Sequence, residues 1–227
     1  MSGGLLYLLL LIPAMVLHEV AHGYVAHLFG DETARDAGRL TLNPLKHIDP
    51  FGSVVLPLML AIGQIASIGH VVFIYGWAKP VPVNPMNLRL KGRGDPRRLM
   101  AIVALAGPAS NFILALLAGL ALHGGMGLDA LVFFIEINLV IGIFNLIPLP
   151  PLDGGRIAVG VLPLPLAMRL AKAERMGIML VFLLIFILPV LLQQFGLRFD
   201  PFQEAMARIL PYGLRIVLML TGNNIGN

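Results

Sequence analysis

The stretch FGSVVLPLMLAIGQIASIGHVVFIY, residues 51–75, decides how the chain is threaded through a membrane. It is long enough to cross a bilayer, which takes about 20 mostly apolar residues. Glycines and polar side chains interrupt its second half, as in a segment that enters the bilayer, bends and leaves on the same side. We predict such a re-entrant hairpin with its bend near Gly63. A full crossing is the alternative.

The chain around this stretch has the composition of a membrane protein. Of its 227 residues, 58% are hydrophobic and only 12% are charged, whereas soluble domains have about 25% charged residues. The sequence predicts an all-α polytopic membrane protein with five to six membrane segments. We predict a single domain over residues 1–227, with its core at about 4–156 and a C-terminal part at 157–227. Further spans are predicted at residues 4–28, 99–122, 130–149 and 177–192, and an interfacial helix at 201–221.

Basic residues indicate which loops share a face. A re-entrant hairpin at 51–75 places 13 of the 16 Lys and Arg residues on one side, whereas a crossing leaves ten there. The positive-inside rule therefore favours the hairpin, with the N-terminus outside and the loops at 29–50, 76–98 and 151–176 in the cytoplasm. Because the net charge of +4 comes from short loops, no nucleic-acid partner is expected. The absence of cysteine excludes disulfides and thiolate zinc sites.

The first span contains the pattern H-E-x-x-H at residues 18–22. Residues four apart on a helix point to one side, so His18 and His22 can hold one metal ion between them. Imidazole suits zinc, and Glu19 can reach a water bound to that ion and activate it. The alternative is an ordinary exposed helix face. It is disfavoured because ionisable side chains inside an apolar span are costly.

A third ligand is predicted in NLIPLPPLDGGRI, residues 145–157, where Asp153 follows three prolines that end the preceding helix. Irregular backbone at membrane depth is tolerated only where protein or water surrounds it. The alternative is that Asp153 caps the next helix. For one Zn²⁺ per chain to contact His18, His22 and Asp153, the first span and the 130–149 span must end on the same face. Only the hairpin allows this.

These motifs, with AGPASNF at 106–112, resemble the site-2 protease family of intramembrane zinc metalloproteases. GRLTLNPLKHIDPFGS at 38–53 and GWAKPVPVNP at 76–85 resemble its compact prokaryotic branch, which lacks PDZ and CBS domains. The resemblance implies that His18, His22 and Asp153 bind zinc and that Glu19 is the catalytic acid and base. It also implies that Asn145 holds the substrate backbone or stabilises the oxyanion, whereas a hydrogen bond to a neighbouring helix is the alternative.

Two further expectations concern the substrate. The resemblance implies a membrane-reentrant β element, here residues 38–43 and 74–83. An unwound substrate segment could add to its edge as a strand. Asn111 is a candidate substrate-binding residue, with helix packing as the alternative.

The predicted function is that of an intramembrane zinc endopeptidase. Its partners are a transmembrane protein substrate and the lipid bilayer of a prokaryotic inner membrane, with the active site toward the cytoplasm. A metal-ion transporter or channel is the main alternative. It is disfavoured because the ligand-type residues converge at one depth rather than along a path. A non-catalytic relative that binds helices is the other alternative, and the oligomeric state is left open.

Overall fold

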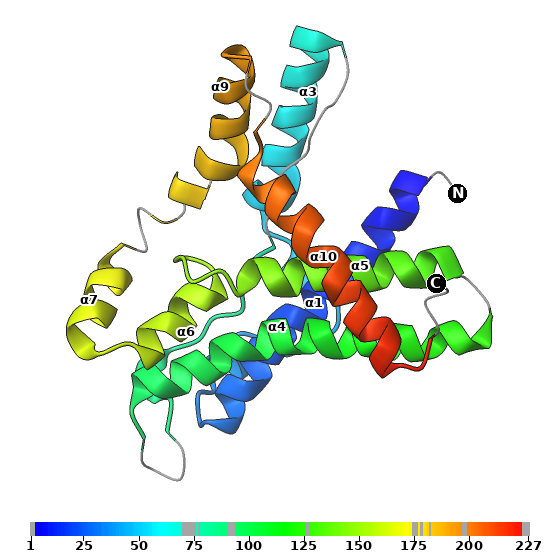
Figure 1. Ribbon diagram of the computed structural model, residues 1–227. Coiled ribbons are helices and arrows are strands. Elements are labelled where there is room, and N and C mark those ends of the chain that lie inside the picture. Colours follow the sequence, from blue (N-terminus) through cyan, green and yellow to red (C-terminus); the bar gives the residue numbers. More distant parts are fainter. Residues whose placement is uncertain are drawn as a thin grey trace.

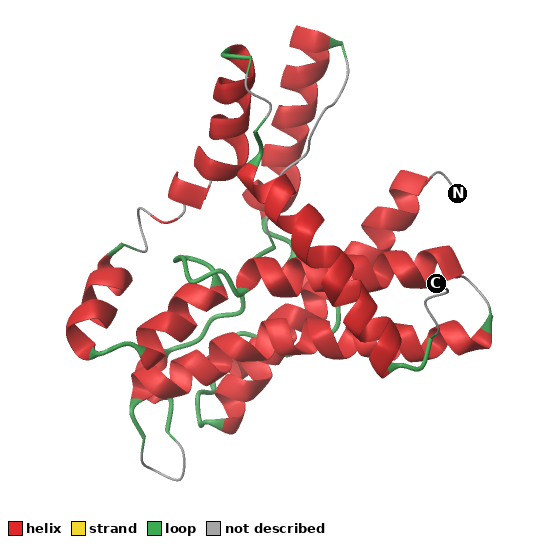
Figure 2. Ribbon diagram, in the orientation of Figure 1, coloured by secondary structure: helices red, strands yellow, loops and turns green. Residues whose placement is uncertain are grey.

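The computed structural model describes residues 3–69, 76, 78–89, 94–125, 128–173, 177, 179–181, 183–196 and 199–223. These residues are mostly helical, and no strand occurs among them (Figure 2). Three helices in this part of the chain are long and apolar enough to cross a membrane: α1 (Gly3–Leu28), α4 (Pro96–Ala121) and α5 (Leu128–Asn145). They coincide with three of the four predicted spans.

Helices α1, α4 and α5 alternate in direction. Asn111 in the middle of α4 bonds to Ala14 of α1, while Leu99 at the start of α4 packs with Ala26 near the end of α1. The two helices are therefore antiparallel. A short connection through η4 (Leu122–Gly124) joins α4 to α5, as between antiparallel neighbours (Figure 1). Helices α1 and α5 consequently end on the same side, as a shared metal site requires.

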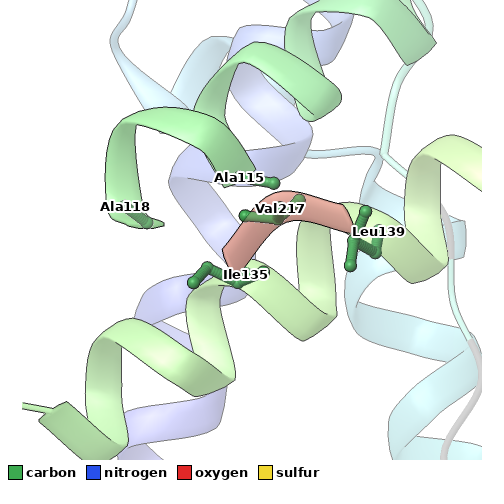
Figure 3. Packing of buried hydrophobic residues seen from close by; sticks show 5 residues of the cluster. All are labelled: Ala115, Ala118, Ile135, Leu139 and Val217. Carbon is green, nitrogen blue, oxygen red and sulfur yellow. The ribbon is translucent and has the colours of Figure 1, made fainter. Parts of the chain in front are cut away.

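A buried apolar cluster fixes α4, α5 and α10 (Pro201–Leu220) together. Side chains from all three helices converge there (Figure 3): Ala115, Ala118, Ile135, Leu139 and Val217. None of them is more than 5% exposed. Within a bilayer, close van der Waals packing of such side chains, rather than their removal from water, holds neighbouring helices together. Helix α10 carries Arg208 and Arg215 and is not among the candidate spans of the described residues, so its interfacial position stays a prediction.

The two described ends of the 51–75 stretch lie close together. The Asp49 carboxylate accepts from the N–H groups of Phe51 and Gly52 and so begins a π-helical turn, η2 (Pro50–Val55), that continues into α3 (Leu56–Ile68). Gly76 lies back against Gly52, because a Cβ on Gly76 would be 2.5 Å from the Gly52 carbonyl oxygen. The two ends of the stretch thus meet, which supports a hairpin over a crossing. Its entry into the bilayer stays a prediction.

The predicted bend near Gly63 is wrong. Helix α3 runs without interruption through Gly63 to Ile68 and ends at Gly69, whose φ of 79° is left-handed. A single glycine weakens a helix by only about 1 kcal/mol relative to alanine, which is too little to end it. Glycine at the position after a helix, by contrast, adopts the left-handed conformation without strain. Helix α3 therefore ends at Gly69.

Other parts of the predicted topology are not confirmed. The fourth predicted span forms a π-helical turn, η5 (Leu183–Ile187), and α9 (Leu188–Gln194) in its described part. The predicted β element is loop at residues 38–43 and at the described positions of 74–83, while Ile74, Tyr75 and Trp77 lie outside the described residues. Short helices complete the chain: α2 (Thr33–Asp36), η1 (Pro44–His47), η3 (Pro85–Asn87), α6 (Asp153–Val161) and α7 (Leu164–Lys172).

Candidate metal centre

Three side chains from two distant parts of the chain meet between α1 and the start of α6. Oδ2 of Asp153 lies 3.1 Å from Nε2 of His18 and 3.2 Å from Nε2 of His22. The two Nε2 atoms are themselves 3.1 Å apart. All three residues are at least 92% buried. The structure thus brings together the three residues that the sequence predicts as ligands.

The triangle of ligand atoms fits a zinc ion. Zinc bonds to imidazole nitrogen and carboxylate oxygen are about 2.0–2.1 Å long, so tetrahedral ligand atoms lie about 3.3 Å apart. The observed separations of 3.1–3.2 Å are close to this value. A fourth position, away from the three protein ligands, would remain for water or substrate. Two histidines and one carboxylate also make up a donor set that zinc accepts.

Hydrogen bonds to the opposite ring nitrogens turn both imidazoles toward the centre. Nδ1 of His18 donates to Oδ1 of Asn111 at 2.6 Å, and Nδ1 of His22 donates to the carbonyl oxygen of Val103 at 2.7 Å. Both acceptors belong to α4. With a proton on Nδ1, each ring keeps a lone pair on Nε2. This is the arrangement that orients metal-binding histidines.

The backbone around Asp153 explains the pattern P-L-P-P-L-D-G-G. Residues 146–152 fold back onto the first turn of α6, so a Cβ on Gly154 would overlap the carbonyl oxygens of Leu146 and Ile147. Asp153 is the first residue of α6, where the helix dipole favours a negative charge. Its carboxylate contacts His18 and His22. The glycines thus let the loop close tightly enough to present Asp153 to α1.

Gly107 of α4 forms one wall of the centre. A Cβ at this position would overlap Nε2 of His22 and lie 2.6 Å from Nε2 of His18. Only a residue without a side chain lets α4 come this close to the two imidazoles.

We expect Gly107→Ala to lower zinc affinity by at least about tenfold, because the added methyl group must push one imidazole away from its metal-binding position. Isothermal titration of the purified protein with zinc measures this. Gly63→Ala is the matched control, since a Cβ at that helical position meets no atom within 4 Å. Equal zinc affinity of the two variants would contradict the packing argument.

Glu19 contacts a loop beside the metal ligands. Its Oε2 accepts from the backbone N–H of Val81 at 2.9 Å, and it lies close enough to His22 for their charges to interact. Pro80 and Pro82 flank Val81 and have no N–H to donate. The described part of the predicted substrate-binding element, residues 78–83, therefore lies beside the predicted acid and base.

Buried polar groups hold this loop in place. Asp31 is fully buried and accepts from the backbone N–H of Asn84 at 2.7 Å and from the Asn87 side chain at 3.1 Å. Burial raises the pKa of the Asp31 carboxyl, but hydrogen bonds from Thr33, Asn84 and Asn87 outweigh it and lower the pKa below its ordinary value. Arg39 adds a bond of 2.6 Å to the carbonyl oxygen of Lys79. The segment that follows α1 thus fixes the loop that contacts Glu19.

The structure places the two predicted asparagines differently. Asn145 ends α5, and its side-chain amide donates to Ile141 one turn back at 3.0 Å. Within the described residues no hydrogen bond joins it to the three clustered side chains, so its predicted role stays a prediction. Asn111 is fully buried, and its amide bonds to His18, Ala14 and Asn138. These bonds use its oxygen and its nitrogen inside the protein, which favours orientation of His18 over contact with substrate.

Sequence reasoning missed Asp31, Gly107 and Asn138. A polar residue within a predicted span is a recognisable signal for Asn138, because unsatisfied polar groups there are costly. Gly107 lies within AGPASNF, one of the motifs that carry the family resemblance, whereas Asp31 has no comparable local signal.

Comparisons with known proteins show which proteins the chain resembles. The model of peptidase family M50 matches residues 124–189. Over 193 residues the chain is 40% identical to YwhC of Bacillus subtilis (strain 168), covering 79% of each protein, and over 161 residues it is 33% identical to Rip2 of Mycolicibacterium smegmatis, covering 63% of this chain and 52% of Rip2. Both relatives bear the name putative zinc metalloprotease. No solved structure matches the chain.

Proposed function

Because the chain belongs to peptidase family M50, the site-2 type of zinc metalloprotease, we propose that it cleaves a peptide bond in or near a transmembrane segment of a membrane protein. This membership confirms the family resemblance of its motifs. Three apolar helices make it an integral membrane protein. The observation that carries the proposal is the convergence of His18, His22 and Asp153 at the ends of α1 and α5, beside Glu19.

In this proposal His18, His22 and Asp153 bind one Zn²⁺ per chain. When bound, zinc polarises a carbonyl group and lowers the pKa of a coordinated water toward about 7. Glu19 accepts a proton from the attacking water and later passes it to the leaving amine. The Val81 N–H holds one oxygen of Glu19, which leaves the other oxygen to take up the proton. Asn145 remains the candidate for contact with the substrate backbone.

An apolar cavity of about 170 Å³ supports an apolar substrate. It adjoins the loop that presents Asp153, and a side chain of an unwound transmembrane segment would fill it. The residues that line it belong to the end of α5, this loop, the segment around η5 and the start of α10: Phe144, Ile147, Leu149, Leu152, Val181, Leu184, Pro201, Phe202, Ala205 and Met206. The cytoplasmic orientation of this end follows from the basic loops and is part of the proposal.

The proposal predicts a zinc-dependent cleavage. Purified protein in liposomes is mixed with a membrane protein that has a single labelled transmembrane segment, and the products are identified by mass spectrometry. A zinc chelator should abolish cleavage and added zinc should restore it, whereas an isomer of the chelator that does not bind metal should have no effect. Zinc flux into the liposomes without cleavage of any transmembrane substrate would contradict the proposal and favour a transporter.

A further inference from the structure

The geometry points to Asn138 of α5 as a positioning residue that fixes which nitrogen of His18 carries the proton. This inference rests on the proposed function, because it concerns the same metal centre. Asn138 is fully buried and lies in the middle of α5, a helix long and apolar enough to cross a membrane. It acts through Asn111, which contacts His18 directly.

Three hydrogen bonds with the same direction connect α5 to the centre. Nδ2 of Asn138 donates to the carbonyl oxygen of Phe134 at 2.8 Å, so Oδ1 of Asn138 faces α4. That oxygen accepts from Nδ2 of Asn111 at 2.8 Å. Oδ1 of Asn111 in turn accepts from Nδ1 of His18 at 2.6 Å. The Phe134 carbonyl can only accept a hydrogen bond, so the NH₂ group of Asn138 must face it. This leaves the Asn138 oxygen to face Asn111, and the NH₂ group of Asn111 must in turn face that oxygen.

The orientation of Asn111 decides the chemistry of His18. If this amide were reversed, its NH₂ group would face Nδ1 of His18, and the imidazole proton would have to move to Nε2. Nε2 is the atom that faces Asp153 and His22, so a proton there would block metal binding. Zinc needs the neutral ring with a lone pair on the ligating nitrogen.

Asn138 opposes this reversal. In the reversed orientation Oδ1 of Asn111 would face Oδ1 of Asn138 and the carbonyl oxygen of Ala14, which now accept from its amide at 2.8 and 3.3 Å. Three acceptors would then face one another without a proton. An unsatisfied buried acceptor costs about 1–3 kcal/mol. Without the Asn138 oxygen, only the longer bond to Ala14 would still select the productive orientation.

A general role in helix packing is the competing explanation, since asparagines within spans often join neighbouring helices. Such a role predicts a loss of stability in Asn138 variants with an unchanged metal centre. The two explanations therefore differ in metal binding measured on folded protein.

Zinc affinity of two Asn138 variants tests the inference. Asn138→Leu has a similar volume but no acceptor, and we expect its zinc affinity, measured by competition with a chelator, to fall about tenfold. Asn138→Asp, neutral when buried, keeps a carbonyl oxygen toward Asn111 and an O–H toward Phe134. We expect it to remain within about threefold of the wild type. The absorption spectrum of the cobalt-substituted protein should change in the first variant and not in the second.

Ser110→Ala is the matched control. The Ser110 hydroxyl donates to the Gly107 carbonyl at 2.7 Å. Ser110 is next to Asn111 on the same helix, but it takes no part in the hydrogen bonds that connect Asn138 to His18. Wild-type zinc affinity and cobalt spectrum in folded Asn138→Leu would overturn the inference and leave the proposed function intact. Absence of zinc binding by the wild type would overturn the proposed function itself.

A second measurement does not depend on the folding of any variant. Nitrogen NMR of labelled histidines in the zinc-free wild-type protein reports which ring nitrogen of His18 is protonated. We expect a proton on Nδ1. An Nδ1 without a proton would overturn the inference, because Oδ1 of Asn111 would then have no proton to accept from His18.

Discussion

We expect the Glu19→Gln variant to cleave a transmembrane substrate at least about a hundredfold more slowly than the wild type while it retains zinc. General acid and base catalysis contributes about 10²–10⁴-fold to rates, and an amide cannot take up the proton that a carboxylate accepts. Gln has the same shape, and its oxygen can still accept from Val81, which bonds to Glu19 at 2.9 Å. The loop and the three ligands should therefore stay in place. Cleavage rates and zinc content measured on the same preparation check both statements.

Glu32→Gln is the control for the loss of one negative charge. Glu32 lies just beyond the end of α1, where its exposed carboxylate pairs with Arg35 and His27. It lies outside the metal centre, so cleavage should be unchanged. A Glu19→Gln protein that retains more than a tenth of the wild-type rate would exclude Glu19 as the acid and base. Loss of zinc from the Glu19→Gln protein would instead indicate that Glu19 helps to bind the metal ion.

The sequence predicts the three long helices because their signal is local. A run of about 20 apolar residues needs no knowledge of its neighbours, and α1, α4 and α5 follow it to within a few residues. The sequence also predicts that α1 ends and α4 begins on the same side, because the distribution of basic residues indicates which loops share a face. The sequence does not predict which glycine ends α3. Gly63 and Gly69 look alike in sequence, and only the structure shows that the helix continues through Gly63 and ends at Gly69.

In the candidate site, too, the features with a local sequence signal were predictable and those set by distant residues were not. The spacing of His18 and His22 and the proline-broken helix before Asp153 predict that these residues meet, and in the structure they do. Their zinc binding stays a prediction. The orientation of His18 was not predictable, because it depends on Asn111, which lies 93 residues further along the chain, and on Asn138 beyond it. A hydrogen-bond direction of this kind is set by three-dimensional neighbours, which a single sequence does not reveal.

Asp153→Ser should lose zinc almost completely, with an affinity more than about a hundredfold below that of the wild type. Catalytic zinc sites have three protein ligands, and the Oδ2 atom that lies 3.1 and 3.2 Å from the two imidazoles would be gone. Loss of a ligand should exceed the roughly 10–100-fold effect of losing a supporting hydrogen bond. Zinc content after dialysis and competition with a chelator measure the loss, and cleavage should disappear with it.

Serine is the informative replacement because its helix propensity is similar to that of aspartate. If Asp153 served only to start α6, the variant would keep both its fold and its zinc. If the carboxylate is a ligand, the variant keeps its helix content and loses the metal. Asp129→Asn is the control, since Asp129 occupies the first turn of α5 at the opposite end of that helix and is exposed. Full zinc occupancy in Asp153→Ser would mean that the two imidazoles bind the ion with some other partner, and the proposed centre would have to be abandoned.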